Sequence, residues 1–157
     1  MAETPEIIVS DQVKALALDL SVTYPRSPRA KLAGYVVLAR AVDKCRATLA
    51  GTAGEYHYDC PLDNMFLGFA EIAGDDLKAF VATGADDEAI AAWVKKRAKA
   101  REDIEVIKWN NRMREMTLGD LPDAPQAFME TYVDEFVPPG KVVYRWFDVY
   151  DYEEKRM

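Results

Sequence analysis

Residues 25–63, PRSPRAKLAGYVVLARAVDKCRATLAGTAGEYHYDCPLD, decide the fold of this chain. Apolar side chains recur in this stretch with helical spacing from Leu32 to Leu49. The spacing predicts one long central helix that begins near Arg29 and ends at Gly51, a residue suited to a left-handed helix cap. A proline-rich segment with two arginines precedes this helix, and a glycine-containing turn follows it. We expect the rest of the chain to pack around the helix.

Two charged residues fall on the apolar side of the predicted helix. On a helical wheel Arg46 lies near the middle of the apolar sector and Asp43 just inside its edge, whereas Arg40, Lys44 and Thr48 fall on the predicted solvated face. Asp43 and Arg46 are three residues apart, so their side chains are able to pair. Buried ions require partners. The sequence leaves two interpretations open, a structural ion pair that joins two helices and one wall of a binding pocket.

Capping residues and apolar spacing predict further helices along the chain. These helices are expected to begin at or near Ser10, Pro61, Asp75, Asp86 or Asp87, Glu102 and Asp123. The helix from Pro61 is expected to end at Gly74, and the tail after Gly140 fits helical spacing slightly better than strand alternation. We predict an all-α fold, a single compact domain over 1–157 with about seven short and medium helices around the central one. Its motif-bearing core covers about 18–116 and its C-terminal extension covers 123–157.

The composition excludes several classes of protein. Half of the 157 residues are apolar and 30% are charged, which is typical of a soluble globular protein. The net charge of -7 argues against general nucleic-acid binding, because phosphate contacts need clustered Lys and Arg, and it leaves open only a local basic patch at Arg26, Arg29 and Lys31. No apolar run approaches the roughly 20 residues that span a bilayer. We therefore expect neither a nucleic-acid partner nor a membrane.

The cysteine content predicts a reduced, cytoplasmic protein. The chain holds two cysteines, Cys45 and Cys60, and shows no signal segment at its start. A single histidine, with no second cysteine near either thiol, argues against a tetrahedral zinc site, so we predict no metal. The sequence indicates no particular cofactor.

Several spaced motifs in the chain resemble those of one protein family. The motifs are PRSPR at 25–29, GY at 34–35, DKCRA at 43–47, AG at 50–51, GEYH at 54–57, CPLD at 60–63 and the pair Trp109-Asn110. Together they resemble a family of small bacterial proteins described as a domain of unknown function, whose pattern is close to PRSPR, GGY, DKARA, LAGT, GEYH and a CPLD-like step. The likeness covers most of residues 18–110, with Ala33 in place of a first glycine. The resemblance implies a fold and the importance of these positions, and no reaction.

The first functional hypothesis is a pocket for a small anionic metabolite, a carboxylate or a phosphate. Guanidinium groups bind such anions bidentately, and Pro25 and Pro28 stiffen the segment that carries two of them. The start of the helix at Pro61 adds free N–H groups. The candidate ligand-binding residues are Arg26, Arg29, Asp43, Arg46, Tyr56, His57 and Asn110.

The second hypothesis is an enzyme. His57 and Cys60 are three residues apart just before a predicted helix, where thiols tend to be reactive, which suggests a Cys-His nucleophile pair. Glu55 and Asp63 are alternative candidates for a general acid or base. A small buried cysteine and a structural histidine are the plainer interpretation of the same residues.

The third hypothesis is a structural or partner-binding module. An acidic surface and four C-terminal aromatic residues, Tyr144, Trp146, Tyr150 and Tyr152, suit a docking surface or a homo-oligomer. Such a surface does not require charges in a buried helical stripe. This is the argument against the third hypothesis.

Overall fold

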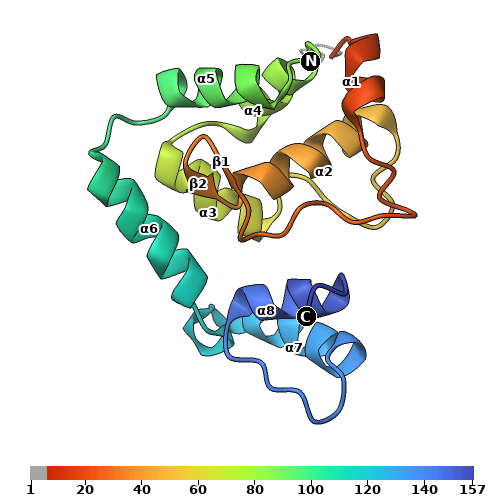
Figure 1. Ribbon diagram of the computed structural model, residues 1–157, viewed down its shortest axis with the longest axis vertical. Helices are drawn as coiled ribbons and strands as arrows, with labels where there is room; N and C mark the ends of the chain where they lie inside the picture. Colours follow the sequence, from red (N-terminus) through yellow and green to blue (C-terminus); the bar gives the residue numbers. More distant parts are fainter. Residues whose placement is uncertain (1–6) are drawn as a thin grey trace, which may run out of the picture. The chain divides into compact units, whose positions relative to one another are not determined.

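The computed structural model describes residues 7–157 (Figure 1). Within these residues the protein is mostly helical, with 57% of residues in helices, eight α-helices and one small antiparallel pair of strands. The predicted helical fold class is therefore confirmed. Contacts divide the chain into two compact units, one with residues up to 26 and 30–100, the other with residues 27–29 and 101–157.

The first unit is built around one helix. Its elements are α1 (Asp11–Leu16), β1 (Lys31–Leu32), β2 (Tyr35–Val36), α2 (Leu38–Ala50), α3 (Pro61–Ala70), α4 (Gly74–Val81) and α5 (Asp87–Arg97). Helices α1, α3 and α4 and the strand β1 all contact α2 (Figure 1). The helix predicted to be central is thus the helix around which this unit packs.

The start of the central helix was predicted wrongly. It begins at Leu38 and not near Arg29, because β1 and β2 form a hairpin in which Leu32 pairs with Tyr35. The two turn residues, Ala33 and Gly34, have φ values of 55° and 86°, as a two-residue type I′ turn requires. A glycine inside the apparent helical pattern was the sequence signal for this turn.

Val37 is the N-cap residue of α2. Its φ of 75° lies in the left-handed region, which a β-branched residue seldom adopts, and its side chain is fully buried. The other end agrees with the prediction, since Gly51 caps α2 with a φ of 75° and donates its N–H to the carbonyl of Ala47.

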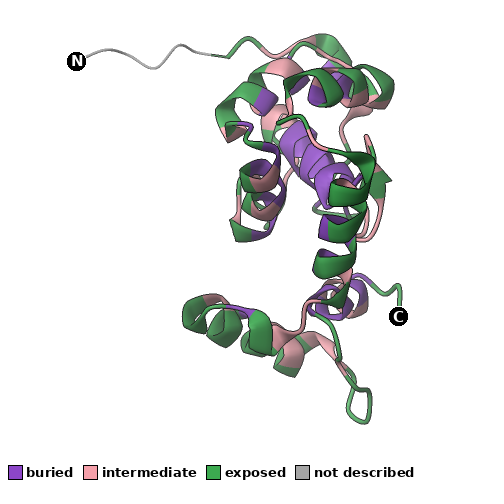
Figure 2. Ribbon diagram, turned by 90° about the vertical axis from the view of Figure 1, so that its left-hand side faces the viewer, coloured by how far each residue is buried: buried purple, intermediate pink, exposed green. Residues whose placement is uncertain are grey.

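Helix α2 is buried on nearly all sides, as its purple colour in Figure 2 shows. Every residue from Leu38 to Ala47 is buried. Arg40 and Lys44 are only 2% and 3% exposed, so their assignment to a solvated face was wrong, and only Thr48 of that predicted face is exposed. Each charged side chain of this helix therefore needs a partner inside the protein.

Two of the predicted helix starts in the first unit are confirmed by their caps. The hydroxyl of Ser10 accepts a hydrogen bond from the N–H of Gln12 at the start of α1. The carboxylate of Asp86 accepts one from the N–H of Ala89 at the start of α5. Both bonds satisfy donors that a helix leaves unpaired in its first turn.

Helix α3 begins at Pro61 as predicted but does not continue to Gly74. It ends at Ala70, because Glu71 adopts the left-handed conformation of a C-cap. Gly74 is instead the first residue of α4. The sequence pattern did not mark this end, since glutamate is not a residue that usually ends a helix.

The second unit contains three helices besides residues 27–29. These are α6 (Asp103–Glu115), α7 (Asp123–Phe136) and α8 (Trp146–Glu153), with a short 3₁₀ helix, η1 (Leu118–Asp120), before α7. Helix α8 packs against both α6 and α7. The tail, whose spacing fitted a helix only slightly better than a strand, is helical from Trp146 to Glu153.

One of the C-terminal aromatic residues is not available to a partner. Trp146 is buried, whereas Tyr144 is exposed and Tyr150 and Tyr152 are half-buried. The expectation that all four form an exposed surface was therefore wrong. The start of α8 places the Trp146 side chain inward, where it contacts Phe147 and Tyr150.

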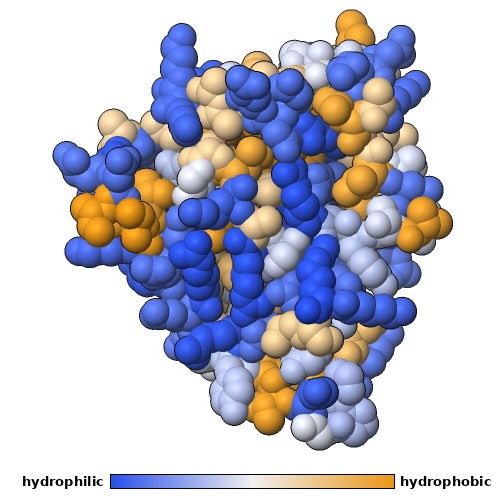
Figure 3. Space-filling model, viewed as in Figure 1, coloured by the Kyte–Doolittle hydropathy of each residue, from blue (hydrophilic) through white to orange (hydrophobic). Residues whose placement is uncertain are grey.

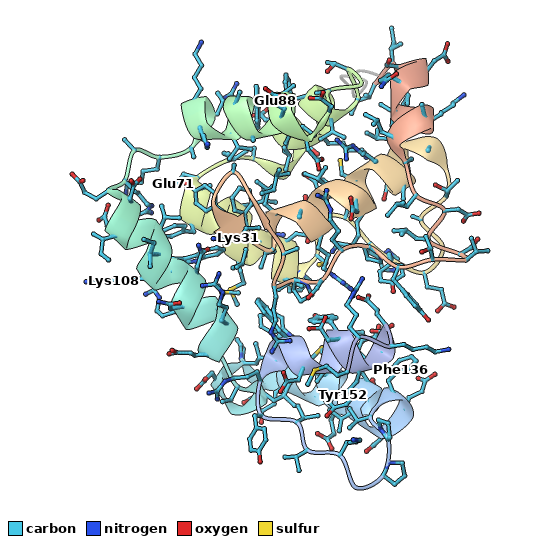
Figure 4. The ribbon with its side chains drawn as sticks, in the orientation of Figure 1. Lys31, Glu71, Glu88, Lys108, Phe136 and Tyr152 are labelled. Carbon is cyan, nitrogen blue, oxygen red and sulfur yellow. The ribbon has the colours of Figure 1, made fainter. Side chains whose placement is uncertain are left out.

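The face seen in Figure 3 is mainly hydrophilic, and its apolar patches are small and separate. Exposed charged side chains such as Lys31, Glu71, Glu88 and Lys108 are labelled in Figure 4. Over residues 7–157 no helix has both the length and the apolar character needed to cross a membrane.

Candidate functional site

Four charged residues of the first unit form a connected group, which we call the ionic cluster: Arg26, Asp43, Arg46 and Asp87. The Asp43 carboxylate accepts hydrogen bonds from the backbone N–H of Arg26 at 2.8 Å and from its Nε at 3.0 Å. The Asp87 carboxylate accepts from Nη1 of Arg26 at 2.8 Å and from Nη1 of Arg46 at 3.0 Å. Asp43 and Arg46 are both buried, as predicted, but each pairs with a partner outside α2.

Arg46 is held firmly in this cluster. Its Nη2 donates to the backbone carbonyl of Ala85 at 3.1 Å, close to the first turn of α5. Its Nε is buried and has no hydrogen-bond partner among residues 7–157. A guanidinium group fixed in this way loses little conformational entropy when it binds an anion.

Asp87 is the most exposed member of the cluster. Its side chain is 43% exposed, compared with 7% for Asp43. Burial by itself would raise the pKa of Asp87, but the hydrogen bonds and positive charges of Arg26 and Arg46 outweigh it and lower the pKa below its ordinary value. Burial likewise acts to lower the pKa of Arg26. The hydrogen bonds and negative charges of Asp43 and Asp87 outweigh burial and raise the pKa of Arg26 above its ordinary value. Arg26 and Asp87 are therefore both charged near neutral pH.

Arg29 belongs to the second unit and has its own carboxylates there. Its Nη2 donates to Asp148 Oδ1 at 2.6 Å, its Nη1 donates to Asp151, and its guanidinium lies 5.9 Å from the ring centroid of Phe147. The second oxygen of Asp148 accepts the backbone N–H of Arg145 at 2.9 Å at the start of α8. Sequence reasoning missed both aspartates, although they stand three residues apart in the tail.

Cys60, Lys44 and Asp63 form a second group in the first unit, which we call the thiol triad. The ammonium of Lys44 forms an ion pair with Asp63 Oδ1 at 2.8 Å and donates to Cys60 Sγ at 3.2 Å. Asp63 Oδ2 accepts the backbone N–H of Asp59 at 2.9 Å. Lys44 was not a predicted site residue, because the helical wheel placed it on the solvated face.

The remaining candidates lie in different surroundings. Glu55 and His57 are exposed, Tyr56 is half-buried with the Arg40 guanidinium 5.6 Å from its ring centroid, and Asn110 is buried in the second unit. The hydrogen-bond donor at the Cys60 sulfur is Lys44, where the sequence suggested His57. Both cysteines are free thiols.

Within the described part of the chain, no three or more His, Cys, Asp or Glu side chains are grouped so that they could hold a metal ion. The carboxylates of the ionic cluster and of the thiol triad are instead paired with arginine and lysine. The ionic cluster thus offers paired charges, and the thiol triad offers a thiol that contacts a paired lysine.

These features define a mostly α-helical protein whose first unit encloses a highly charged helix. Residues 22–156 match the family described as "Domain of unknown function (DUF5069)", and the chain belongs to that family. The match continues through α8, beyond residues 18–110 that carry the recognised motifs, so the C-terminal segment is part of the family domain. Curated proteins include no match to this chain.

Proposed function

We propose that the ionic cluster binds a small anion, a carboxylate or a phosphate, in the place now taken by the Asp87 carboxylate. The observation that carries the proposal is that two guanidinium groups, from Arg26 and Arg46, converge on one carboxylate that is 43% exposed. Paired arginines match the spaced oxygens of carboxylates and phosphates. A carboxylate group already fits between them, so an external one of similar shape has partners in position.

Asp87, and not Asp43, is the group that a ligand would replace. Asp43 is buried and accepts three hydrogen bonds from Arg26, so it keeps that arginine in place. Asp87 is the first residue of α5 and its side chain reaches solvent. When Asp87 moves away, two guanidinium groups and one carboxylate remain, which is a site of net positive charge. The positive end of α5 adds to it.

The wider proposal keeps the features expected from the sequence. Tyr56 and His57, which belong to the same unit, stay candidate ligand-binding residues, although the proposal needs only Arg26 and Arg46. That the protein is bacterial and cytoplasmic, and that its ligand is a metabolite, are also part of the proposal. The bacterial origin rests on the family resemblance, and the cytoplasmic location rests on the two cysteines being free thiols.

The test is a titration of wild-type protein and an Asp87→Asn variant with inorganic phosphate and with succinate, at constant ionic strength. Asn keeps the shape of Asp but removes the competing charge, so we expect phosphate to bind Asp87→Asn about tenfold more tightly than wild type, a change of about 1.4 kcal/mol. Isothermal titration calorimetry measures the affinity. Arg46→Met should abolish the response to both anions.

The control is Arg97→Met, which removes an exposed arginine of the same helix α5 that pairs with the exposed Asp76. This variant should respond to phosphate like wild type. If Arg46→Met fails to fold, Arg26→Met in the Asp87→Asn background supplies the same comparison with a half-exposed arginine. Equal phosphate responses in wild type, Asp87→Asn and Arg97→Met would overturn the proposal.

A further inference from the structure

The thiol triad has the arrangement of an activated nucleophile. Cys60 Sγ is 3.2 Å from Nζ of Lys44, and Nζ is 2.8 Å from Oδ1 of Asp63. In such an arrangement a nucleophile contacts a group that carries a proton, and a third group orients that second one. Asp63 is itself held by the N–H of Asp59, so the whole chain of contacts is fixed. Cys60 is therefore not an isolated thiol.

Burial strengthens the electrostatics of the triad. The side chains of Lys44 and Asp63 are 4% and 0% exposed, whereas Cys60 is half-buried and can be reached from solvent. Charges interact more strongly in such a water-poor environment. Cys60 also stands at the N-cap position of the ten-residue helix α3. An adjacent lysine and a helix N-terminus are two of the features that make protein thiols reactive, and both occur here.

We infer that Cys60 is a nucleophilic thiol that reduces hydroperoxides, with Lys44 as the proton donor to the leaving oxygen. The thiolate sulfur attacks one oxygen of hydrogen peroxide, the S–O bond forms and the O–O bond breaks. Sulfur is oxidised by two electrons and the peroxide is reduced. The leaving hydroxide takes a proton from Nζ of Lys44 and departs as water, which leaves Cys60 as a sulfenic acid. Lys44 then regains its proton from solvent.

The chain offers no second reactive thiol to complete an internal cycle. Its other cysteine, Cys45, is fully buried, and burial raises the pKa of Cys45 to about 12. We therefore expect an external thiol to attack the Cys60 sulfenic acid, which forms a mixed disulfide and releases water. Cys45 serves as an internal negative control in every experiment.

The test is oxidation of the full-length protein by hydrogen peroxide in the presence of dimedone, which traps sulfenic acids. A protease that cuts before aspartate separates the two cysteines, because Asp59 lies between them. Mass spectrometry should find dimedone on Cys60 while Cys45 stays unmodified. Cys60 should be oxidised at least about tenfold faster in the folded protein than in the urea-unfolded chain.

Variants separate the triad from an ordinary accessible thiol. Lys44→Met should slow oxidation of Cys60 by about tenfold or more, whereas Lys95→Met, which removes an exposed lysine of α5, should not change it. Because Lys44→Met leaves the buried Asp63 unpaired, the double variant Lys44→Met with Asp63→Leu supplies a second, charge-free comparison. Circular dichroism establishes that each variant is folded.

Two results would overturn the inference. One is a Cys60 oxidation rate in the folded protein no higher than in the unfolded chain. The other is a wild-type rate in the folded double variant, which would mean that the ammonium has no part in the reaction. The phosphate titration above uses other residues, so the two proposals can fail independently.

Discussion

Lys44 illustrates how a single residue in this protein differs from what its position on the helical wheel indicates. It is 3% exposed although the wheel places it opposite the apolar sector, and its ammonium is neutralised by Asp63. Arg46 is buried as the wheel indicates, but its carboxylate partner comes from α5 and not from α2. The helical wheel therefore predicted the burial of Arg46 but not that of Lys44, and it predicted the partner of neither residue.

At this scale we predict that Lys44→Met is strongly destabilising. It leaves the fully buried Asp63 carboxylate without its counter-ion, which typically costs about 3–5 kcal/mol. Urea unfolding followed by circular dichroism measures the change. The double variant with Asp63→Leu should recover a large part of the loss, because it removes both charges. A single variant as stable as wild type would contradict the structural role of this pair.

At the scale of one element, the hairpin before α2 is the part that the helical pattern misrepresented. Its strands have only two residues each, so apolar residues with helical spacing can occupy both strands and the start of α2. The determining features are local φ values at Ala33, Gly34 and Val37, all positive. The family pattern indicated this turn, since it has two glycines where this chain has Ala33 and Gly34.

The hairpin turn gives a prediction of opposite effects at two neighbouring positions. Ala33→Asn should stabilise the protein by about 0.5–1 kcal/mol, because Asn tolerates the positive φ of a type I′ turn better than Ala. Gly34→Ala should destabilise it by about 1 kcal/mol or more through backbone strain alone, since an added Cβ meets no atom within 4 Å. Thermal unfolding of both variants measures the difference, and stabilisation by Gly34→Ala would contradict the turn type.

Asp148 of helix α8 predicts how the stability of the protein changes at acid pH. Burial would raise the pKa of Asp148, but the N–H of Arg145 and the guanidinium of Arg29 outweigh it and hold the pKa below the ordinary 3.8. A carboxyl whose pKa is lower in the folded state stabilises the protein fully above its unfolded value and loses that effect as the pH falls through the folded value. The free energy of unfolding should therefore fall as the pH drops below about 4.

The control for the acid prediction is Asp148→Asn. This variant should be less stable than wild type at pH 7 and should lose less stability between pH 5 and pH 3, as urea titrations at about six pH values would measure. An unchanged acid dependence would mean that Asp148 does not titrate with a lowered pKa.

At the scale of the whole molecule, charge is the property that limits partners. The chain carries 27 acidic and 20 basic residues, and several of the basic ones, including Arg26, Arg29 and Lys44, are already paired with carboxylates. We therefore expect no measurable binding to a labelled DNA duplex at physiological salt by fluorescence anisotropy. Binding that weakens steeply with added salt would contradict this expectation.

The sequence by itself determined the helical class, most helix starts and the burial of Asp43 and Arg46. Apolar periodicity and capping act over a few neighbouring residues, as at Ser10, Asp86 and Gly51, so they can be recognised without the fold. Only the tertiary structure decided which charges meet. Arg26 and Asp87 are 61 positions apart and Lys44 and Cys60 are 16 apart. Such pairs depend on how helices pack, and no local pattern of residues encodes that choice.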